Sequence, residues 1–170
     1  GHLVGALVEG IPAVGGSSPN SLAATGKHVF VSNGTNDNIS VISIETDTVV
    51  STIYLKPDPR IRQFRGVIPF GLSLSPDNTR LYAAASGINA VAVIDTKTLL
   101  VFIPTGWFPS KVEVSPDGKR LMVANAKGFG SGPNAGPAFK PGPEGSYIGA
   151  LMKGTVQIVD IPAERDLKRL

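Results

Sequence analysis

One pattern occurs three times along this 170-residue chain, and this repetition restricts the chain to architectures built from copies of a single unit. Each copy begins at a proline, and the second and third of these, Pro69 and Pro109, lie 40 residues apart. The interval from Pro19 to Glu45 in the first copy is 26 residues, as is the interval from Pro69 to Asp95 in the second. Such agreement between intervals is hard to obtain by chance.

Each copy contains short runs in which apolar residues alternate with small or polar ones, the pattern of a half-buried β-strand. In the second copy we expect four strands, at about 71–75, 80–84, 90–95 and 99–104. The turns between them contain Ser-Pro-Asp followed by Asn or Gly, residue types that favour tight hairpin turns. The copies therefore indicate four-stranded antiparallel units.

A four-stranded antiparallel unit that recurs at about 40 residues is typical of a β-propeller blade. We predict an all-β chain whose residues 1–162 form a partial β-propeller, an arc of about three four-stranded blades from a seven-bladed ring. The predicted boundaries are blades at about 19–53, 69–104 and 109–161, the remnant of a preceding blade at 1–16, a long loop insertion at 126–154, and the start of a linker or of a missing outer strand at 163–170.

Three blades cannot close a ring, because closed propellers have about four to eight. We therefore expect the chain to belong to a longer protein, with its neighbouring blades or domain as partners. We also expect the isolated chain to self-associate, because this would cover its open apolar faces.

The residue pattern of the strands and turns resembles the YVTN-type β-propeller repeat over roughly residues 13–162. The resemblance rests on Ser-Pro-Asp-Gly/Asn, then Leu-Tyr/Met-Val-x-Asn, then Val-x-Val-Ile-Asp-Thr, although Ala85 stands where the repeat has Asn. More narrowly, the segments 104–109, 124–128, 132–134 and 149–155 resemble bacterial propellers fused ahead of an alkaline-phosphatase-like phosphoesterase domain. This resemblance implies a phosphoesterase-associated protein in the periplasm or outside the cell.

The connections between the predicted strands separate onto two faces, because consecutive strands are antiparallel. One face receives short turns, and the other, here called the loop face, receives the segments 34–38, 54–68, 86–89, 105–109 and 126–154. These segments hold seven Lys and Arg side chains against three Asp and Glu, an excess of four, whereas the whole chain carries +3. Long irregular loops gathered on one face are where a binding site is expected.

Six residues of the loop face are our candidates for binding a ligand or partner: Arg60, Arg62, Arg65, Trp107, Lys127 and Asn134. The basic residues suit a small anionic ligand, such as a phosphate or carboxylate, or an acidic partner domain, with Trp107 as an apolar anchor. The alternative is that the charges are solvated loop residues and that Trp107 packs within a blade. Asn33 and Asn125, at strand ends, are predicted to cap turns by bonding backbone.

No catalytic residue, metal site or cofactor is predicted. The chain has no cysteine and only two histidines, His2 and His28, so neither a His-rich metal site nor a triad base can be assembled. The glycines at 128–132 match neither a nucleophile elbow nor a phosphate-binding loop. With 6% aromatic residues and a charge of +3, nucleic acid is not an expected partner, and no run of about 20 apolar residues indicates a membrane span.

Three functions remain open from the sequence. The first is a non-catalytic binding or scaffold module within a larger extracytoplasmic phosphoesterase-type protein. The second is a fragment of a lactonase-like propeller hydrolase, whose acid and base residues would come from blades outside this chain. The third is a surface-layer or adhesion repeat protein. Fold alone does not decide among them, because propellers support many functions.

Overall fold

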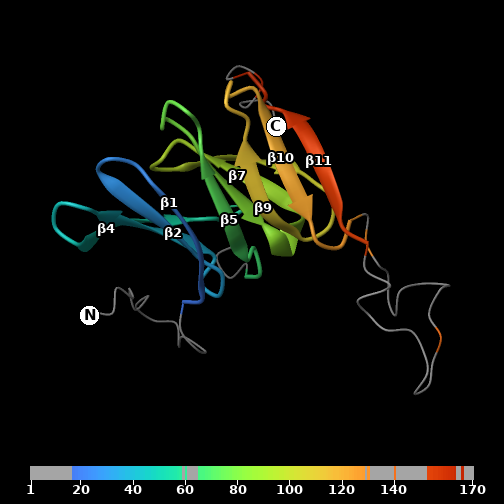
Figure 1. Ribbon diagram of the computed structural model, residues 1–170. Helices are drawn as coiled ribbons and strands as arrows, with labels where there is room; N and C mark the ends of the chain where they lie inside the picture. Colours follow the sequence, from blue (N-terminus) through green and yellow to red (C-terminus); the bar gives the residue numbers. More distant parts are fainter. Residues whose placement is uncertain are drawn as a thin grey trace.

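The computed structural model describes residues 17–58, 60, 65–128, 130, 140, 153–163 and 166. Within these residues the chain forms β-strands, joined by turns and one short 3₁₀-helix, η1 (Ser86–Ile88) (Figure 1). The first sheet contains β1 (Pro19–Ala24), β2 (His28–Asn33), β3 (Asn38–Ser43) and β4 (Thr48–Tyr54). The second contains β5 (Pro69–Leu74), β6 (Leu81–Ala85), β7 (Ala90–Ile94) and β8 (Leu99–Pro104). The third contains β9 (Pro109–Val114), β10 (Arg120–Asn125) and β11 (Thr155–Asp160).

The predicted all-β class is confirmed, and every strand pairs antiparallel with the next strand of its own sheet. The strands of the second sheet lie within two residues of their predicted positions. In the described residues the third sheet has three strands, and its outer strand is the one that the sequence leaves missing at 163–170. The segment 1–16 lies outside the described residues, as does most of 163–170 and of the predicted insertion at 126–154.

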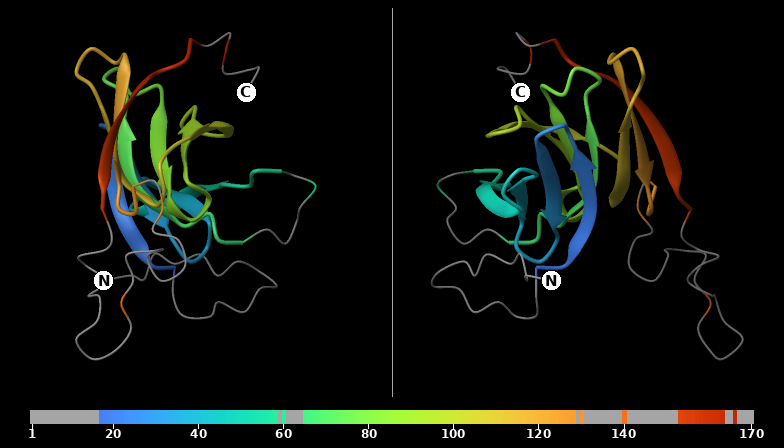
Figure 2. Two further views of the ribbon diagram at one scale, coloured as in Figure 1. Left: turned by 90° about the vertical axis from the view of Figure 1, so that its right-hand side faces the viewer. Right: turned by 60° about the vertical axis from the view of Figure 1, so that its left-hand side comes forward.

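The sheets follow one another along an arc, with the second sheet between the first and the third (Figures 1 and 2). Their first strands, β1, β5 and β9, adjoin in that order. The hydroxyl oxygen of Ser21 accepts a hydrogen bond from the Leu72 amide at 3.2 Å, and that of Ser73 accepts one from the Val114 amide at 3.2 Å. This arrangement of small antiparallel sheets packed face to face is that of β-propeller blades.

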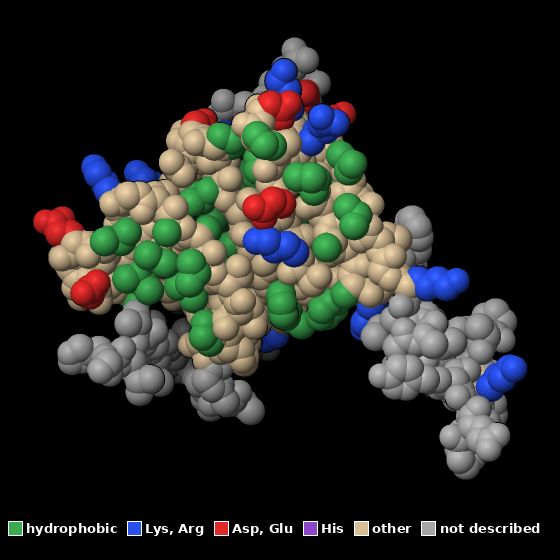
Figure 3. Space-filling model, viewed as in Figure 1, with side chains coloured by type: hydrophobic (Ala, Val, Ile, Leu, Met, Phe, Trp, Pro, Cys, Tyr) green, Lys and Arg blue, Asp and Glu red, His purple; other side chains and the backbone are tan. Residues whose placement is uncertain are grey.

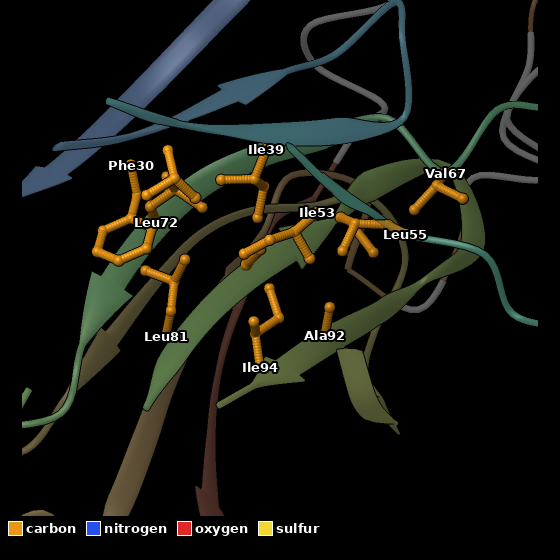
Figure 4. Packing of buried hydrophobic residues seen from close by; sticks show 12 residues of the cluster. Phe30, Ile39, Ile53, Leu55, Val67, Leu72, Leu81, Ala92 and Ile94 are labelled. Carbon is orange, nitrogen blue, oxygen red and sulfur yellow. The ribbon is translucent and has the colours of Figure 1, made fainter. Parts of the chain in front are cut away.

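Two apolar clusters hold the three sheets together, one in each interface. In the first, Phe30 and Ile39 of the first sheet meet Leu72 and Leu81 of the second, all at most 2% exposed (Figure 4). In the second cluster, residues on the opposite face of the second sheet meet the third sheet. Its members are Tyr82, Val91, Val93 and Ile103 from the second sheet and Val112, Leu121 and Val123 from the third. Among the described residues, the second sheet is the only one covered on both faces, and its successive side chains point alternately to the two clusters.

Buried polar side chains join β2 to β3 in the first sheet and β10 to β11 in the third. The amide Nδ2 of Asn33 donates to Asn38 Oδ1 at 2.9 Å and to Ser40 Oγ at 2.8 Å. In the third sheet the Nδ2 of Asn125 donates to Thr155 Oγ1 at 3.3 Å. The predicted bonds from these asparagines to turn backbone are therefore wrong. The reason is that the neighbouring strand presents polar side chains directly opposite each asparagine.

In the second sheet, alanines occupy the equivalent positions. Ala85 stands opposite Ala90, and Ala92 lies where the first sheet has Ser40; the three are at most 5% exposed. Ala85 departs from the Asn of the repeat, and the next strand departs with it, because alanines replace the polar partners there. The contact is therefore wholly apolar and leaves no polar side chain without a hydrogen-bond partner.

We expect this matching to appear as non-additive stability. Ala85→Asn alone should lower the free energy of unfolding by about 1–3 kcal/mol, because the amide is buried without partners. The triple variant Ala85→Asn, Ala90→Asn, Ala92→Ser should recover most of that loss by recreating the network of the first sheet. Urea unfolding of both variants tests this, and a triple variant no more stable than the single one would contradict it.

No helix among the described residues is long and apolar enough to cross a membrane.

Candidate functional site

The loop face is organised around the buried carboxylate of Asp37, in the turn between β2 and β3. Its Oδ2 accepts a hydrogen bond from the Gly66 amide at 2.8 Å, and its Oδ1 accepts one from the Ile68 amide at 2.9 Å. On its other side the segment 66–68 pairs with η1, because the Ser86 amide donates to Ile68 O and the Gly87 amide to Val67 O. The first two sheets therefore position the connection that carries Arg65.

A second group of loop residues surrounds Trp107, between β8 and β9. The Trp107 amide donates to Gly128 O at 2.6 Å, and the Lys127 amide donates back to Trp107 O at 3.1 Å. A side chain at Gly130 would press on the indole, since a Cβ there would lie 3.0 Å from the ring. Trp107 is nevertheless 48% exposed. Backbone hydrogen bonds thus order the loop that carries a half-exposed tryptophan.

Lys127 lies beside Phe108, the residue that follows Trp107. Its Nζ lies 5.2 Å from the centre of the Phe108 ring, within the range of a cation–π interaction. The Phe108 backbone has a positive φ of 54° and its amide donates to Asn89 Oδ1 at 2.9 Å. We call Trp107, Phe108, Lys127 and Gly130 the tryptophan cluster.

Behind this cluster lies a buried acceptor without a partner. Asn125 is 2% exposed, and its Oδ1 is the only buried side-chain N or O atom of the described residues that lacks a hydrogen bond. Its Nδ2 lies close to Gly106, where a Cβ would approach it to 2.7 Å. An unpaired buried carbonyl oxygen is costly to the stability of the fold.

The structure brings together only two of the six predicted site residues, Trp107 and Lys127. Arg60 lies apart as a local pair with Asp58, which its side chain contacts at 2.6 Å while remaining 88% exposed. The Asp58 hydrogen bonds raise the pKa of Arg60, and those of Arg60 lower the pKa of Asp58. Arg65 is exposed next to Gly66. Arg62 and Asn134 lie outside the described residues.

Sequence reasoning missed the contributions of Asp37, Asn89 and Phe108. Asp37 and Asn89 both adopt positive φ, of 52° and 55°, as Asp and Asn in tight turns often do. The presence of these residue types in the short turns 34–37 and 86–89 was a usable signal. Their partners were not predictable, since each bonds a segment from a different connection.

The opposite face of the sheets carries a hollow of about 390 Å³ between the second and third sheets. It is lined by the two Ser-Pro-Asp turns and by Tyr82, Ile161 and Pro162. Each aspartate is used within its own turn, because Asp77 Oδ1 accepts from Ser75 and Thr79, and Asp117 Oδ1 from Ser115 and Lys119. The hollow is thus formed mainly by groups that stabilise the turns.

These turn bonds should make stability depend on pH. The Ser75 hydroxyl, then the Thr79 amide, hold the pKa of Asp77 below its ordinary 3.8, and the Ser115 hydroxyl and Lys119 amide do the same for the pKa of Asp117. A depressed folded-state pKa contributes stability that is present above the unfolded value and lost as pH falls through the folded value. Replacing both aspartates with asparagine should therefore shrink the loss of stability between about pH 6 and about pH 3. Urea midpoints at the two pH values measure this, and an unchanged difference would contradict it.

No protein-family model matches the chain, and no curated protein matches it. Solved structures share its fold. Hydrazine synthase from Kuenenia stuttgartiensis aligns with a TM-score of 0.57 and 24% identity, over 65% of this chain and 30% of that chain. Putative 6-phosphogluconolactonases from Bacteroides fragilis and Bacteroides uniformis align with TM-scores of 0.56 and 0.52 and identities of 22% and 17%.

The similarity is therefore one of fold alone, that of a β-propeller. The two alignments cover 65% and 67% of this chain but 32% and 36% of the lactonase chains. This chain spans about a third of the length of the structures that it matches.

Proposed function

We propose that this chain is a non-catalytic binding module of the β-propeller type, and that its tryptophan cluster binds a small anionic ligand. The observation that carries the proposal is the 48% exposure of Trp107 in a loop held by backbone hydrogen bonds. A half-exposed large aromatic in an ordered loop offers apolar contact area without a large ordering cost.

The neighbouring groups suggest the ligand class. Lys127 supplies a positive charge beside the Phe108 ring, which suits a phosphate or carboxylate. Trp107 supplies apolar contact area beside that charge. The excess of basic residues on the loop face favours an anion over a cation.

Trp107 is the only tryptophan of the chain, so its fluorescence reports on this site alone. We expect a saturable change in emission on titration with 6-phosphogluconate, which combines phosphate, carboxylate and hydroxyl groups. Inorganic phosphate and gluconate, titrated separately, distinguish which part of the probe is recognised. Lys127→Gln should weaken binding about tenfold, as loss of a charge-assisted contact of about 1.4 kcal/mol requires.

Lys119→Gln is the matched control, because Lys119 is an exposed lysine on the opposite, short-turn face. It should leave the titration unchanged. If none of the three probes gives a saturable change, or if Lys127→Gln binds as tightly as the parent chain, the proposed site is wrong.

A lactonase activity is the second candidate, favoured by the fold shared with putative 6-phosphogluconolactonases. Under our proposal, 6-phosphogluconolactone should open no faster with the chain present than in buffer alone. Proton release measures the rate of ring opening. Acceleration that is lost in a heat-denatured sample would favour the hydrolase. The YVTN-type repeat, the neighbouring phosphoesterase domain and the extracytoplasmic location remain predictions from sequence resemblance, and the gene segments flanking this chain test them.

A further inference from the structure

The strand register defines equivalent positions in the three sheets. Asn33 stands opposite Asn38, Ala85 opposite Ala90, and Asn125 opposite Thr155. Counting from these pairs, three positions of each sheet point toward the following sheet. They are Phe30, Ile39 and Val41 in the first sheet, Tyr82, Val91 and Val93 in the second, and Met122, Val156 and Ile158 in the third. We call these the leading faces.

The leading faces of the first two sheets are buried and that of the third is open. No residue of the first two leading faces is more than 5% exposed, because the next sheet covers each of them. In the third sheet Met122 is 38% exposed, Ile158 63% and Val156 75%. Figure 3 shows hydrophobic side chains gathered over β10 and β11 in this region. The leading face is thus covered in two sheets and open in the third.

The first sheet presents the complementary surface. In the second sheet Leu72 and Leu81, with Ala83 and Ile94, receive a leading face, and Val112, Leu121, Val123 and Val159 do so in the third. The equivalent residues of the first sheet are Leu22, Val29, Val31 and Ile42. Leu22 is 67% exposed and the others are half-buried, and none of the four belongs to either core cluster. We call them the trailing face.

We infer that the leading face of the third sheet docks on the trailing face of the first sheet of a second copy of this chain. The repeat itself supplies the argument, because both faces are built from the positions that form the two interfaces within the chain. Two copies joined this way through both pairs of faces would contribute six sheets, within the range of closed propellers. Closure uses every open face and prevents open-ended growth.

The first strand of the third sheet, β9, departs from the repeat, and this departure indicates which strands of the leading face make the docking contact. Lys111 and Glu113 of β9 form an ion pair at 3.2 Å and are more than half exposed. At the equivalent positions the second sheet has the small residues Gly71 and Ser73. A partner sheet cannot approach this charged pair as closely as β9 approaches β5. The docking contact therefore lies on β10 and β11.

Light scattering coupled to size exclusion tests the inference on the full chain. We expect a mass of twice 17.7 kDa at about 100 µM, with dissociation on dilution. Ile158→Lys and Leu22→Glu should each weaken the dimer at least about tenfold, because a charge is placed in an apolar contact. Leu100→Lys is the matched control, since Leu100 is 40% exposed on the outer strand of the sheet that is covered on both faces.

Mixing the two variants distinguishes this geometry from others. An Ile158→Lys copy and a Leu22→Glu copy can form one unaltered contact and one in which the new charges are opposite, so their mixture should regain the dimer. A dimer formed by two leading faces would not be rescued by mixing. Val156→Lys, on the same face, replaces Ile158→Lys if circular dichroism shows that the latter does not fold.

A folded monomer of the parent chain at about 100 µM would overturn the inference. So would a dimer that Ile158→Lys and Val156→Lys leave intact, or a mixture that stays monomeric. None of these three results bears on ligand binding at Trp107, which is measured separately by its fluorescence.

Discussion

Replacing Gly87 with alanine should destabilise the fold by about 3 kcal/mol or more. A Cβ at this position would overlap the carbonyl oxygen of Gly66. The backbone cannot easily move away, because the Gly87 amide donates to Val67 O at 3.0 Å and the Ser86 amide to Ile68 O at 3.1 Å. Urea unfolding followed by circular dichroism measures the loss.

Gly26→Ala provides the matched control. Gly26 lies in the turn between β1 and β2, has no positive φ, and has open space within 4 Å of an added Cβ. Alanine there should change the free energy of unfolding by less than about 1 kcal/mol, in the stabilising direction if the backbone is unstrained. Equal losses at the two glycines would show that Gly87 and Gly66 are not in contact as described.

Replacing Asp37 with alanine should cost about 3–5 kcal/mol. The side chain is 6% exposed and its two oxygens accept the Gly66 and Ile68 amides. Hydrogen bonds to a charged group are among the stronger ones, and both amides would be left without an acceptor. The measurement is again the urea midpoint, with the slope checked for two-state unfolding.

Two further substitutions separate the causes at Asp37. Asp37→Gly removes the carboxylate but relaxes the positive φ of 52°, so it should be nearly as destabilised as alanine if the hydrogen bonds dominate. Asp37→Asn keeps one acceptor oxygen and tolerates the same backbone conformation, so its loss should be smaller. A glycine variant close to the parent chain in stability would assign the effect to backbone strain instead.

The candidate site was only partly predictable. The sequence indicates Trp107 and Lys127 because they lie in loops of one face, and backbone hydrogen bonds join the two residues. The same reasoning indicates Arg60, but Arg60 pairs with Asp58 two residues away. Net charge indicates which face is basic, whereas the local partner of each charge depends on loop conformation that the sequence does not specify.

The repeat, the all-β class and the positions of the strands can be read from the sequence alone, because alternation of apolar residues and turn chemistry act over a few neighbouring residues. The tertiary structure decided which residues meet across sheets: that Asp37 holds Gly66 and Ile68, that alanines at 85, 90 and 92 replace a polar network, and that Ile158 is left uncovered. These contacts join residues far apart in the chain, and close packing between sheets selects them, so no local pattern encodes them.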